Sequence, residues 1–288
     1  MHSCWRAGAI AAAAVLLAGC GPTFADGPSA SSASRGGRPP AAPSTAAANT
    51  PAAAATTRST PATESGPAPV VVLDPGHDGG NAAAPAVINK LVPAGGYLKP
   101  CNTTGTSTDA GYPEHAFTFD VAARTAGLLR AHGVRVVLTR PDDAGVGPCV
   151  DRRAAIANAA GAALTVSIHA DGAAAGVRGF HVIEPALAPD RGNSGVLAAS
   201  GKAALDLRAA FAAATGEPPA AYPGALVEPG LTRRNDLAGL NLARVPAVFI
   251  ECANMRNPTD AAEVTSAVWR QQAAQGIADG ILTFVGSP

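Results

Sequence analysis

The chain has 288 residues, 47% of them hydrophobic, and its 21 basic side chains balance its 21 acidic ones. A neutral net charge argues against a broad nucleic-acid-binding surface, which needs an excess of basic residues. Aromatic residues make up only 4% of the chain, so stacking platforms for single-stranded nucleic acid are not expected. The length suits one or two domains.

Residues 1–20 have the pattern of an export signal. Arg6 gives a positive start, and a short apolar stretch at 7–17 follows it. This stretch is shorter than the roughly 20 apolar residues that span a bilayer. It ends in the sequence LAGC, which resembles a bacterial lipobox, and we therefore expect a lipoprotein signal peptide with lipidation of Cys20. The alternative is an ordinary signal peptide in which Cys20 has no special role.

A low-complexity segment follows at residues 21–69. It contains no Leu, Ile, Val, Met, Tyr or Trp, and cannot bury enough apolar area to offset the entropy lost on ordering. We expect a disordered linker that can extend far enough to act as a tether. The alternative is a low-complexity segment with no such function, which would have the same composition. A lipid on Cys20 would hold the mature chain at the outer face of a membrane, as an exported protein of the cell envelope.

The remainder, residues 70–288, is predicted to form a single α/β domain. In chain order, we expect a strand at 70–73, an irregular segment with a hairpin at 75–112, a helix at 113–132, a strand at 134–139, a helix at 151–160, strands at 164–168 and 179–183, a helix at 194–215, a strand at 247–250 and a final helix at 259–284. This alternation implies a mainly parallel, twisted sheet flanked by helices on both faces. The helix at 194–215 is expected to belong to one of these layers.

Three of the predicted strands each lead into a side chain that can bind a metal or transfer a proton. His77 comes shortly after the first strand, while His169 and Glu251 directly follow 164–168 and 247–250. Ligands bind at the carboxyl ends of strands in open parallel sheets, so the three side chains are expected at one edge. Each alone would be an ordinary loop or surface residue. Their coincidence indicates a site.

Glu114 adds a fourth group. On the predicted helix it lies in line with Phe117 and Val121, at steps of three and four residues, and is therefore expected to face the sheet. A carboxylate at the end of an apolar stripe needs a partner. That partner is either the N-terminus of its own helix or a metal. His115 and Asp120 point elsewhere on the helix and are expected to be solvated.

Two imidazoles and one carboxylate around an open position are typical of catalytic zinc. We expect His77, Glu114 and His169 to hold one Zn²⁺, which lowers the pKa of water and polarises a carbonyl. Glu251 would then carry a proton from the water to the leaving nitrogen. The pattern predicts amide hydrolysis without choosing the amide.

Four stretches in order resemble the zinc-dependent N-acetylmuramoyl-L-alanine amidases of the Amidase_3 family. They are 71–77, Glu114 with 133–140, 153–158 with 165–171, and 246–251 with 254–257. The resemblance covers essentially residues 70–285 and implies the family's α/β fold. It also implies zinc binding by His77, Glu114 and His169, with Glu251 as the catalytic carboxylate. The implied reaction cleaves the amide between the lactyl group of N-acetylmuramic acid and L-Ala of the peptidoglycan stem peptide.

Cys101 and Cys149 lie in irregular segments near the presumed active edge, and we expect a disulfide between them in an exported protein. Zinc ligation by these cysteines is the alternative, although their spacing matches no Cys₂-type motif. Cys252 is expected to be buried and unpaired. His132 and His181 are expected to be structural.

Other residues near the predicted strand ends suggest supporting roles. Asp74 either orients the loop that bears His77 or forms a plain Asp-Pro-Gly turn. Arg233, Arg234 and Asn235 lie in a predicted loop and are candidates for binding the carboxylates of the stem peptide. A solvated basic loop is the alternative for these three residues.

The leading hypothesis is a zinc amidase that acts on peptidoglycan in cell-wall remodelling or recycling. A zinc peptidase or deacylase acting on another amide, and an inactive cell-wall-binding lipoprotein, are the alternatives. All four chemical positions are filled, which argues against inactivity. Nothing indicates an interface, so we expect a monomer whose partners are peptidoglycan and the membrane, and not nucleic acid.

Overall fold

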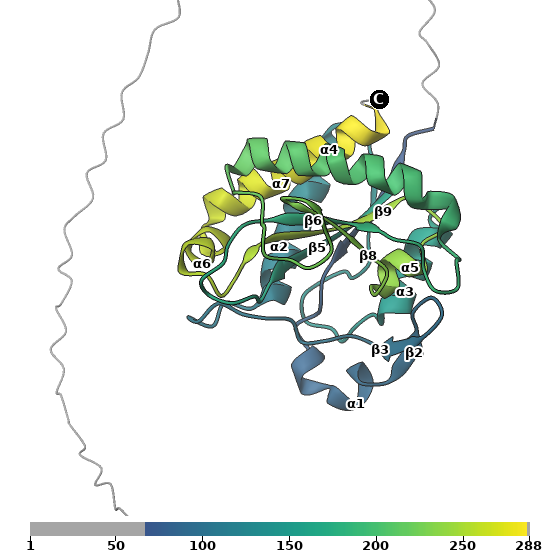
Figure 1. The fold of residues 1–288 in the computed structure, drawn as a ribbon, viewed down its shortest axis with the longest axis horizontal. Coiled ribbons are helices and arrows are strands. Elements are labelled where there is room, and N and C mark those ends of the chain that lie inside the picture. Colours follow the sequence, from purple (N-terminus) through teal and green to yellow (C-terminus); the bar gives the residue numbers. More distant parts are fainter. Residues whose placement is uncertain (1–66, 287–288) are drawn as a thin grey trace, which may run out of the picture. The chain divides into compact units, whose positions relative to one another are not determined.

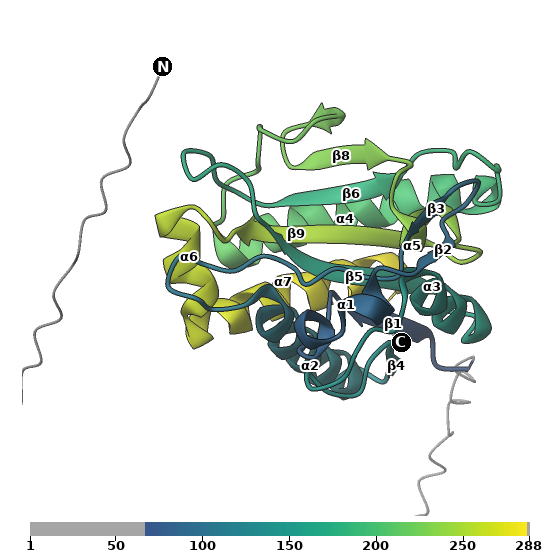
Figure 2. The same ribbon diagram turned by 90° about the horizontal axis from the view of Figure 1, so that it is seen from below.

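A seven-stranded sheet organises residues 67–286, the part of the chain that the computed structural model describes (Figure 1). The strands are β1 Val70–Pro75, β4 Arg135–Leu138, β5 Leu164–Asp171, β6 His181–Pro185, β7 Leu226–Glu228, β8 Leu231–Arg234 and β9 Ala247–Asn254. Their order across the sheet is β4-β1-β5-β9-β6-β8-β7 (Figure 2). All neighbours are parallel except β6–β9 and β7–β8, so the prediction of a mainly parallel sheet is confirmed.

Helices cover both faces of this sheet (Figure 1). They are α1 Pro85–Ile88, α2 Glu114–Ala131, α3 Val150–Ala159, α4 Leu197–Thr215, α5 Ala238–Asn241, α6 Pro258–Thr265 and α7 Ala267–Val285. On one face, α2, α4 and α7 share a large apolar core with the sheet, to which Phe117, Leu207 and Ile277 contribute. On the other face, α3 packs through Ala157 and α5 packs through Leu240. As expected, α4 belongs to an ordinary layer.

The continuous apolar run at the start of the domain follows from the position of β1 inside the sheet. β1 lies between β4 and β5 and is covered on both faces, so residues 71–73 are completely buried. A strand buried on both faces shows no alternation of polar and apolar side chains. This places the carboxyl ends of β1 and β5 side by side, and both lead into the candidate site.

Some element boundaries differ from the predictions. β5 and β9 are longer than expected, so His169 and Glu251 lie inside strands and not after them. The final helix is divided at Ser266, whose side chain accepts a hydrogen bond from Trp269 N and starts α7. The segment at 231–234 is the short strand β8 and not a loop. The expected hairpin is formed by β2 Leu91–Pro93 and β3 Leu98–Pro100.

The predicted signal peptide at 1–20, the lipidated Cys20 and most of the predicted linker at 21–69 lie outside the described residues. Within residues 67–286, no helix is both long enough and apolar enough to cross a membrane.

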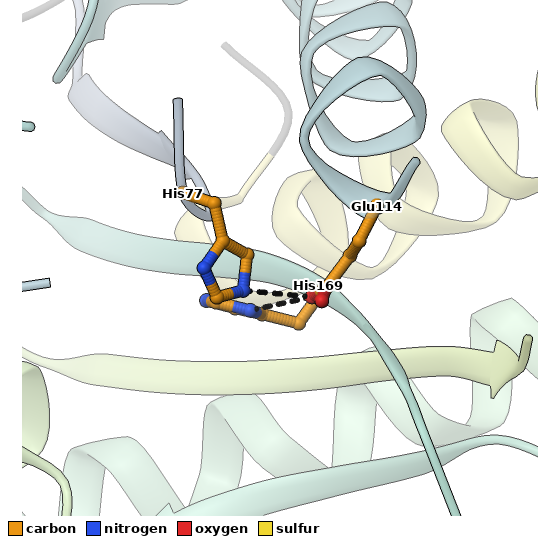
Figure 3. Close-up of side chains that lie close together, drawn as sticks. All are labelled: His77, Glu114 and His169. Carbon is orange, nitrogen blue, oxygen red and sulfur yellow. Dashed lines mark hydrogen bonds and ion pairs between the residues drawn. The ribbon is translucent and has the colours of Figure 1, made fainter. Parts of the chain in front are cut away.

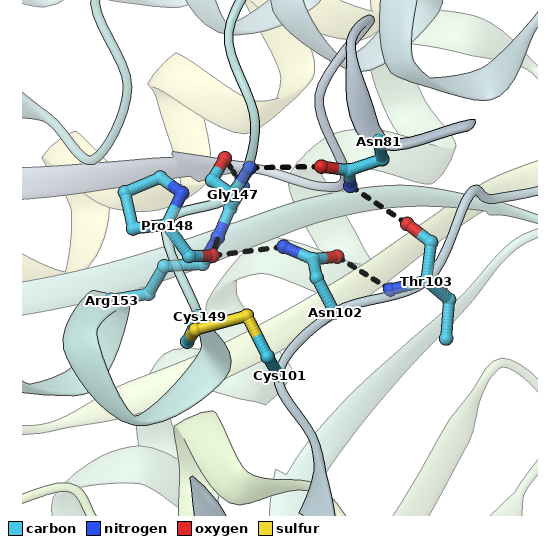
Figure 4. The surroundings of a disulfide bond; sticks show 8 residues. All are labelled: Asn81, Cys101, Asn102, Thr103, Gly147, Pro148, Cys149 and Arg153. Carbon is cyan, nitrogen blue, oxygen red and sulfur yellow. Dashed lines mark hydrogen bonds between the residues drawn. A yellow bond between two sulfur atoms is a disulfide. The ribbon is translucent and has the colours of Figure 1, made fainter. Parts of the chain in front are cut away.

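The expected disulfide joins Cys101 and Cys149 (Figure 4). It ties the segment after the hairpin to the start of α3. Hydrogen bonds reinforce the connection, because Asn102 Nδ2 donates to Pro148 O at 2.8 Å and Asn81 bridges the same two segments. Cys252 is buried and free, as predicted.

We predict that reducing this disulfide destabilises the protein by about 4 kcal/mol. The bridge closes a loop whose ends are 48 residues apart, and the chain-entropy model gives about that value for a loop of this size. Urea unfolding with and without reductant measures the difference. The variant that carries both Cys101→Ala and Cys149→Ala serves as the control and should not respond to reductant. An intact mass that does not rise on reduction would show that the bridge is absent.

Candidate active site

His77, Glu114 and His169 converge at the carboxyl edge of the sheet (Figure 3). Glu114 Oε1 lies 3.1 Å from His77 Nε2 and 2.9 Å from His169 Nδ1. The three side chains come from the loop after β1, the first residue of α2 and β5. Their ligand atoms all lie within 4.8 Å of one another, which is close enough for one metal ion to contact all three.

The local backbone around His77 is unusual and permits this convergence. His77 has a φ of 59°, a left-handed conformation that non-glycine residues adopt rarely and that is often found at functional sites. A Cβ at Gly76 would collide with the imidazole ring of His169. A Cβ at Gly105, whose φ is 80°, would lie 2.9 Å from both Glu114 Oε2 and His77 Cδ2. Glycine at these two positions therefore makes room for the cluster.

Two buried arginines hold the loop that carries His77. Arg153 donates to Pro75 O at 2.6 Å and to His77 O at 2.7 Å. Arg140 donates to Pro75 O at 3.1 Å and to Gly76 O at 3.2 Å. Three consecutive carbonyls thus accept hydrogen bonds from guanidinium groups, which are rigid, permanently charged donors. The conformation of the loop is therefore fixed by buried side chains from two other segments of the chain.

Asp74 completes this support. Its Oδ1 accepts hydrogen bonds from Arg153 at 2.8 Å and from Thr139 at 2.6 Å, and its Oδ2 accepts one from Ser167 at 2.7 Å. Burial opposes ionisation of this carboxyl, but the charge of Arg153 and these hydrogen bonds outweigh burial and hold the pKa of Asp74 below its usual value. Asp74 therefore orients the loop of His77 through Arg153. Of its two predicted roles, the structure supports this one and not that of a simple turn residue.

The environment of the cluster suits a divalent cation. His77 Nδ1 lies 3.1 Å from Thr103 O, which leaves Nε2 directed at Glu114, an arrangement common for metal-binding histidines. Burial disfavours the charged form of His77, but the carboxylate of Glu114 outweighs it and raises the pKa of His77. Burial also disfavours ionised Glu114, yet the two histidines hold the pKa of Glu114 far below its usual value. Two imidazoles and one carboxylate match a catalytic zinc site.

Glu251 lies next to the cluster on β9, in register with His169 on β5. The residue is half-buried, and its Oε2, which is enclosed by the protein, finds no hydrogen-bond partner among residues 67–286. Burial raises the pKa of Glu251 to about 8. Two residues earlier, the ring of Phe249 stacks on the ring of His169 with centroids 5.2 Å apart. Glu251 therefore has an uncommitted carboxylate oxygen beside the three candidate ligands.

A pocket of about 340 Å³ opens onto these groups. The three candidate ligands and Glu251 line it, together with Lys99 of the hairpin and Arg234 of β8. The edge of the sheet thus places a candidate metal site and a candidate proton carrier in one cavity.

Comparison with known proteins agrees with this geometry. Residues 71–283 match the family model of Amidase_3, N-acetylmuramoyl-L-alanine amidase. The chain belongs to the Amidase_3 family. It is 43% identical over 233 residues to the N-acetylmuramoyl-L-alanine amidase Rv3717 of Mycobacterium tuberculosis, and the match covers 80% of this chain and 90% of that protein.

Solved structures of Amidase_3 relatives are also similar. The N-acetylmuramyl-L-alanine amidase Ami1 of Mycobacterium smegmatis matches with a TM-score of 0.70 and 46% identity. The match covers 78% of this chain and 100% of that one. Ami1 of Mycobacterium abscessus has a TM-score of 0.69 and 42% identity, covering 76% of this chain and 99% of that one. The single α/β domain with helices on both faces is therefore the fold of this amidase family.

The structure separates the three residues predicted to bind substrate in this Amidase_3 domain. Successive residues of a strand point to opposite faces of a sheet. On β8, Arg234 lines the catalytic pocket, whereas Arg233 points to the other face and pairs with Glu184 at 2.6 Å. Asn235 lies outside the catalytic pocket and contacts the hairpin, because its carbonyl accepts a hydrogen bond from Tyr97 at 3.4 Å. Of the three, Arg234 alone lines this pocket.

The remaining histidines and Asp120 lie outside the cluster. His115 and Asp120 point away from the cluster, as expected, and both are partly exposed; His115 pairs with Asp143 at 2.8 Å and Asp120 pairs with Arg124 at 2.9 Å. His132 ends α2, and its Nδ1 lies 2.9 Å from Leu128 O. His181 is buried on β6 opposite Glu251.

A second group of carboxylates already has a cation among its members. Glu217, Asp260 and Glu263 lie close together, and Arg178 pairs with all three at 2.9, 2.7 and 3.1 Å. One guanidinium thus neutralises the group, which is an ion-pair network that ties the segment before β6 to α6 and to the end of α4.

Sequence reasoning missed the buried arginines and Lys99. Arg153 lies on the buried side of α3 with Ala154 and Ala157, and a charged residue on an apolar stripe was the signal that could have revealed it. Lys99 gave no such signal, because its partner Asp236 is 137 residues away in the sequence.

We predict that Asp74→Asn lowers the free energy of unfolding by about 3 kcal/mol at neutral pH, because it leaves the buried charge of Arg153 without its partner. The pKa of Asp74 is lower in the folded chain than the ordinary value of 3.8 for this carboxyl. The stabilisation is therefore complete above about pH 4 and is lost as the pH falls through the folded value. Urea unfolding of the metal-free protein between about pH 7 and about pH 3 measures this dependence.

Asp279→Asn is the matched control, since Asp279 is exposed, and it should change stability little at any pH. A difference between wild type and Asp74→Asn that stays constant down to the lowest pH would contradict the ion-pair account.

Proposed function

We propose that this chain hydrolyses the amide bond between the lactyl group of N-acetylmuramic acid and L-Ala of the peptidoglycan stem peptide, with one Zn²⁺ bound by His77, Glu114 and His169. The observation that supports it most strongly is the convergence of these three side chains beside the unpaired Oε2 of Glu251, in a member of the Amidase_3 family. The residues present have the donor set and the spacing that zinc requires.

Zinc, when bound, would polarise the scissile carbonyl and lower the pKa of water. The chain itself supplies the proton transfer. Glu251 has a free Oε2 beside the cluster and a pKa raised to about 8 by burial. A carboxyl with a pKa near neutral pH can accept a proton from water and return it to the departing amide nitrogen. Hydrolysis then requires Glu251 to act first as a base and then as an acid.

The pocket around Glu251 limits the access of bulk water to this transfer. Phe249 covers the ring of His169, and Thr103 and Thr106 shield the other side by contacts to His77 and Glu114. Charges interact more strongly in such a partly desolvated cavity than in water. The support of the loop at 75–77 by Arg140 and Arg153 would keep His77 in place during turnover.

We further propose that the protein works at the cell envelope, where its substrate lies, in remodelling or recycling of the wall. This part rests on the sequence of residues 1–69, with its signal-like start, Cys20 and low-complexity segment. A lipid on Cys20 would anchor the catalytic domain to a membrane, and the linker would let it reach the wall.

We predict that Glu251→Gln lowers turnover by about three orders of magnitude, because it removes the proton carrier while keeping the size of the side chain. Zinc content should stay at one per chain, since Glu251 is not part of the ligand cluster. The measurement is mass spectrometry of the products formed from purified muropeptides by the zinc-loaded enzyme.

The expected products of the wild type are free stem peptides that begin with Ala. Cuts inside the peptide would indicate a peptidase instead, and no product at all would indicate a binding protein. Glu228→Gln, an exposed position on β7, is the control and should leave turnover intact. If Glu251→Gln loses zinc, then Glu251 is a ligand and the assignment of its role is wrong.

A further inference from the structure

Two cationic side chains line the catalytic pocket in addition to the groups already described. Lys99 comes from strand β3 of the hairpin, and Arg234 comes from the end of β8. A third cation, Arg153, also reaches the pocket, but its donors are committed to Asp74 and to backbone carbonyls. Lys99 and Arg234 are therefore the cations to consider as ligands for a substrate.

Both side chains are anchored on the same residue, Asp236. Lys99 Nζ donates to the carbonyl oxygen of Asp236 at 2.6 Å. Arg234 binds the carboxylate of Asp236 with Nε at 2.8 Å and with Nη2 at 2.7 Å. Because one residue holds both, the ammonium and the guanidinium lie close together and have fixed positions. Such pre-organisation lowers the entropy cost of binding a ligand.

Each cation retains donors that face no protein acceptor. The ammonium of Lys99 has three N–H donors, of which Asp236 takes one. Arg234 Nη1 has no hydrogen-bond partner in the described part of the chain, since Asp236 uses only Nε and Nη2. Lys99 also forms no ion pair with a carboxylate among residues 67–286. Asp236 offers Lys99 only its carbonyl oxygen and gives its carboxylate to Arg234, and although Asp171 and Glu251 also line the pocket, neither forms an ion pair with the two cations.

We propose that Lys99 and Arg234 form a subsite that binds a carboxylate of the substrate. This inference rests on the proposed function and names its substrate class, namely stem peptides whose second residue has a free carboxylate. Charge-assisted hydrogen bonds from ammonium and guanidinium groups are the usual means of recognising a carboxylate. The subsite then selects the acid form of that residue against its neutral amide.

The dimensions agree with this substrate. The pocket that holds the candidate metal ligands, Lys99 and Arg234 has a volume of about 340 Å³. The carboxylate of the second stem residue lies within about 7 Å of the scissile nitrogen, because an extended chain advances at most about 3.5 Å per residue. A single cavity of this size can therefore hold the scissile amide and the carboxylate together.

The hairpin delivers Lys99 to this position through further contacts. Tyr97 donates from its hydroxyl to Asn235 O at 3.4 Å, and Asn241 Nδ2 donates to Ala94 O at 2.9 Å. These bonds dock the hairpin on α5 and on the segment that precedes it. Asn235 thus supports the subsite through its backbone, while its neighbour Arg234 supplies a donor.

The experiment compares two substrates that differ only in this carboxylate. They are the γ-methylamides of N-acetylmuramoyl-L-Ala-D-Glu, which keeps a free α-carboxylate, and of N-acetylmuramoyl-L-Ala-D-isoglutamine, which has a neutral α-amide, each cleaved by the zinc-loaded enzyme. We expect the wild type to favour the acid about tenfold in kcat/KM, mostly through KM, since a hydrogen bond to a charged group is worth about that factor. In Lys99→Met, the preference should fall to about twofold or less.

Arg233→Met is the matched control. Arg233 is adjacent in sequence, but it pairs with Glu184 on the other face of the sheet and does not line the catalytic pocket. It should keep the full preference. Equal kcat/KM for the two substrates in the wild type would overturn the proposal, and so would an unchanged preference in Lys99→Met.

A binding measurement separates this proposal from the proposed function. Calorimetry with the γ-methylamides of the dipeptides L-Ala-D-Glu and L-Ala-D-isoglutamine should show about tenfold tighter binding of the acid to the zinc-loaded wild type. Equal affinities would overturn the subsite even if cleavage is normal. If neither muramoyl substrate is cleaved but the acid dipeptide still binds more tightly, the proposed reaction fails and the carboxylate subsite stands.

Discussion

The hydrogen bonds from Arg140 and Arg153 to the carbonyls of residues 75–77 are the constraint on which this site depends. A loop that places His77 in a left-handed conformation has an unfavourable φ angle, and its backbone carbonyls need hydrogen-bond donors from elsewhere in the protein. The two guanidinium groups donate hydrogen bonds to these carbonyls from the protein interior and hold the loop against the sheet. Asp74 pairs with Arg153 at 2.8 Å and orients its guanidinium group. The fold thereby stabilises a backbone conformation that the sequence of the loop alone would not favour.

The same principle of anchoring through a second residue recurs on the other wall of the pocket. There Asp236 holds both Lys99 and Arg234, while the disulfide from Cys101 fixes the segment after the hairpin. The pocket thus has two opposed regions with distinct chemistry. One region gathers imidazoles and carboxylates suited to a cation, and the other presents cationic donors suited to a carboxylate. An amide substrate with a nearby negative charge satisfies both regions at once.

The sequence predicted the sheet, together with His77, His169 and Glu251, because continuous apolar runs precede these residues and such runs reveal buried strands. Glu114 was recognisable in another way, since it is in line with the apolar stripe of its helix. His169 and Glu251 were placed one step outside their strands because their polarity masks the extension of β5 and β9. The division of the last helix at Ser266 was missed because no Gly or Pro marks it. The anchoring of Lys99 by Asp236 joins residues far apart in the chain, and local patterns contain no information about such contacts.

Because Arg153 fixes the loop that carries His77, the affinity for a metal should depend on a residue outside the ligand cluster. Calorimetric titration of metal-free Arg153→Lys with Zn²⁺ tests this claim most directly, since Lys keeps the charge but loses the fork of donors that Pro75 and His77 accept. We predict zinc binding weaker by about 10-fold to 100-fold, while Arg152→Lys, the exposed neighbour, binds zinc like the wild type. An unchanged zinc affinity in a folded Arg153→Lys protein would contradict the account.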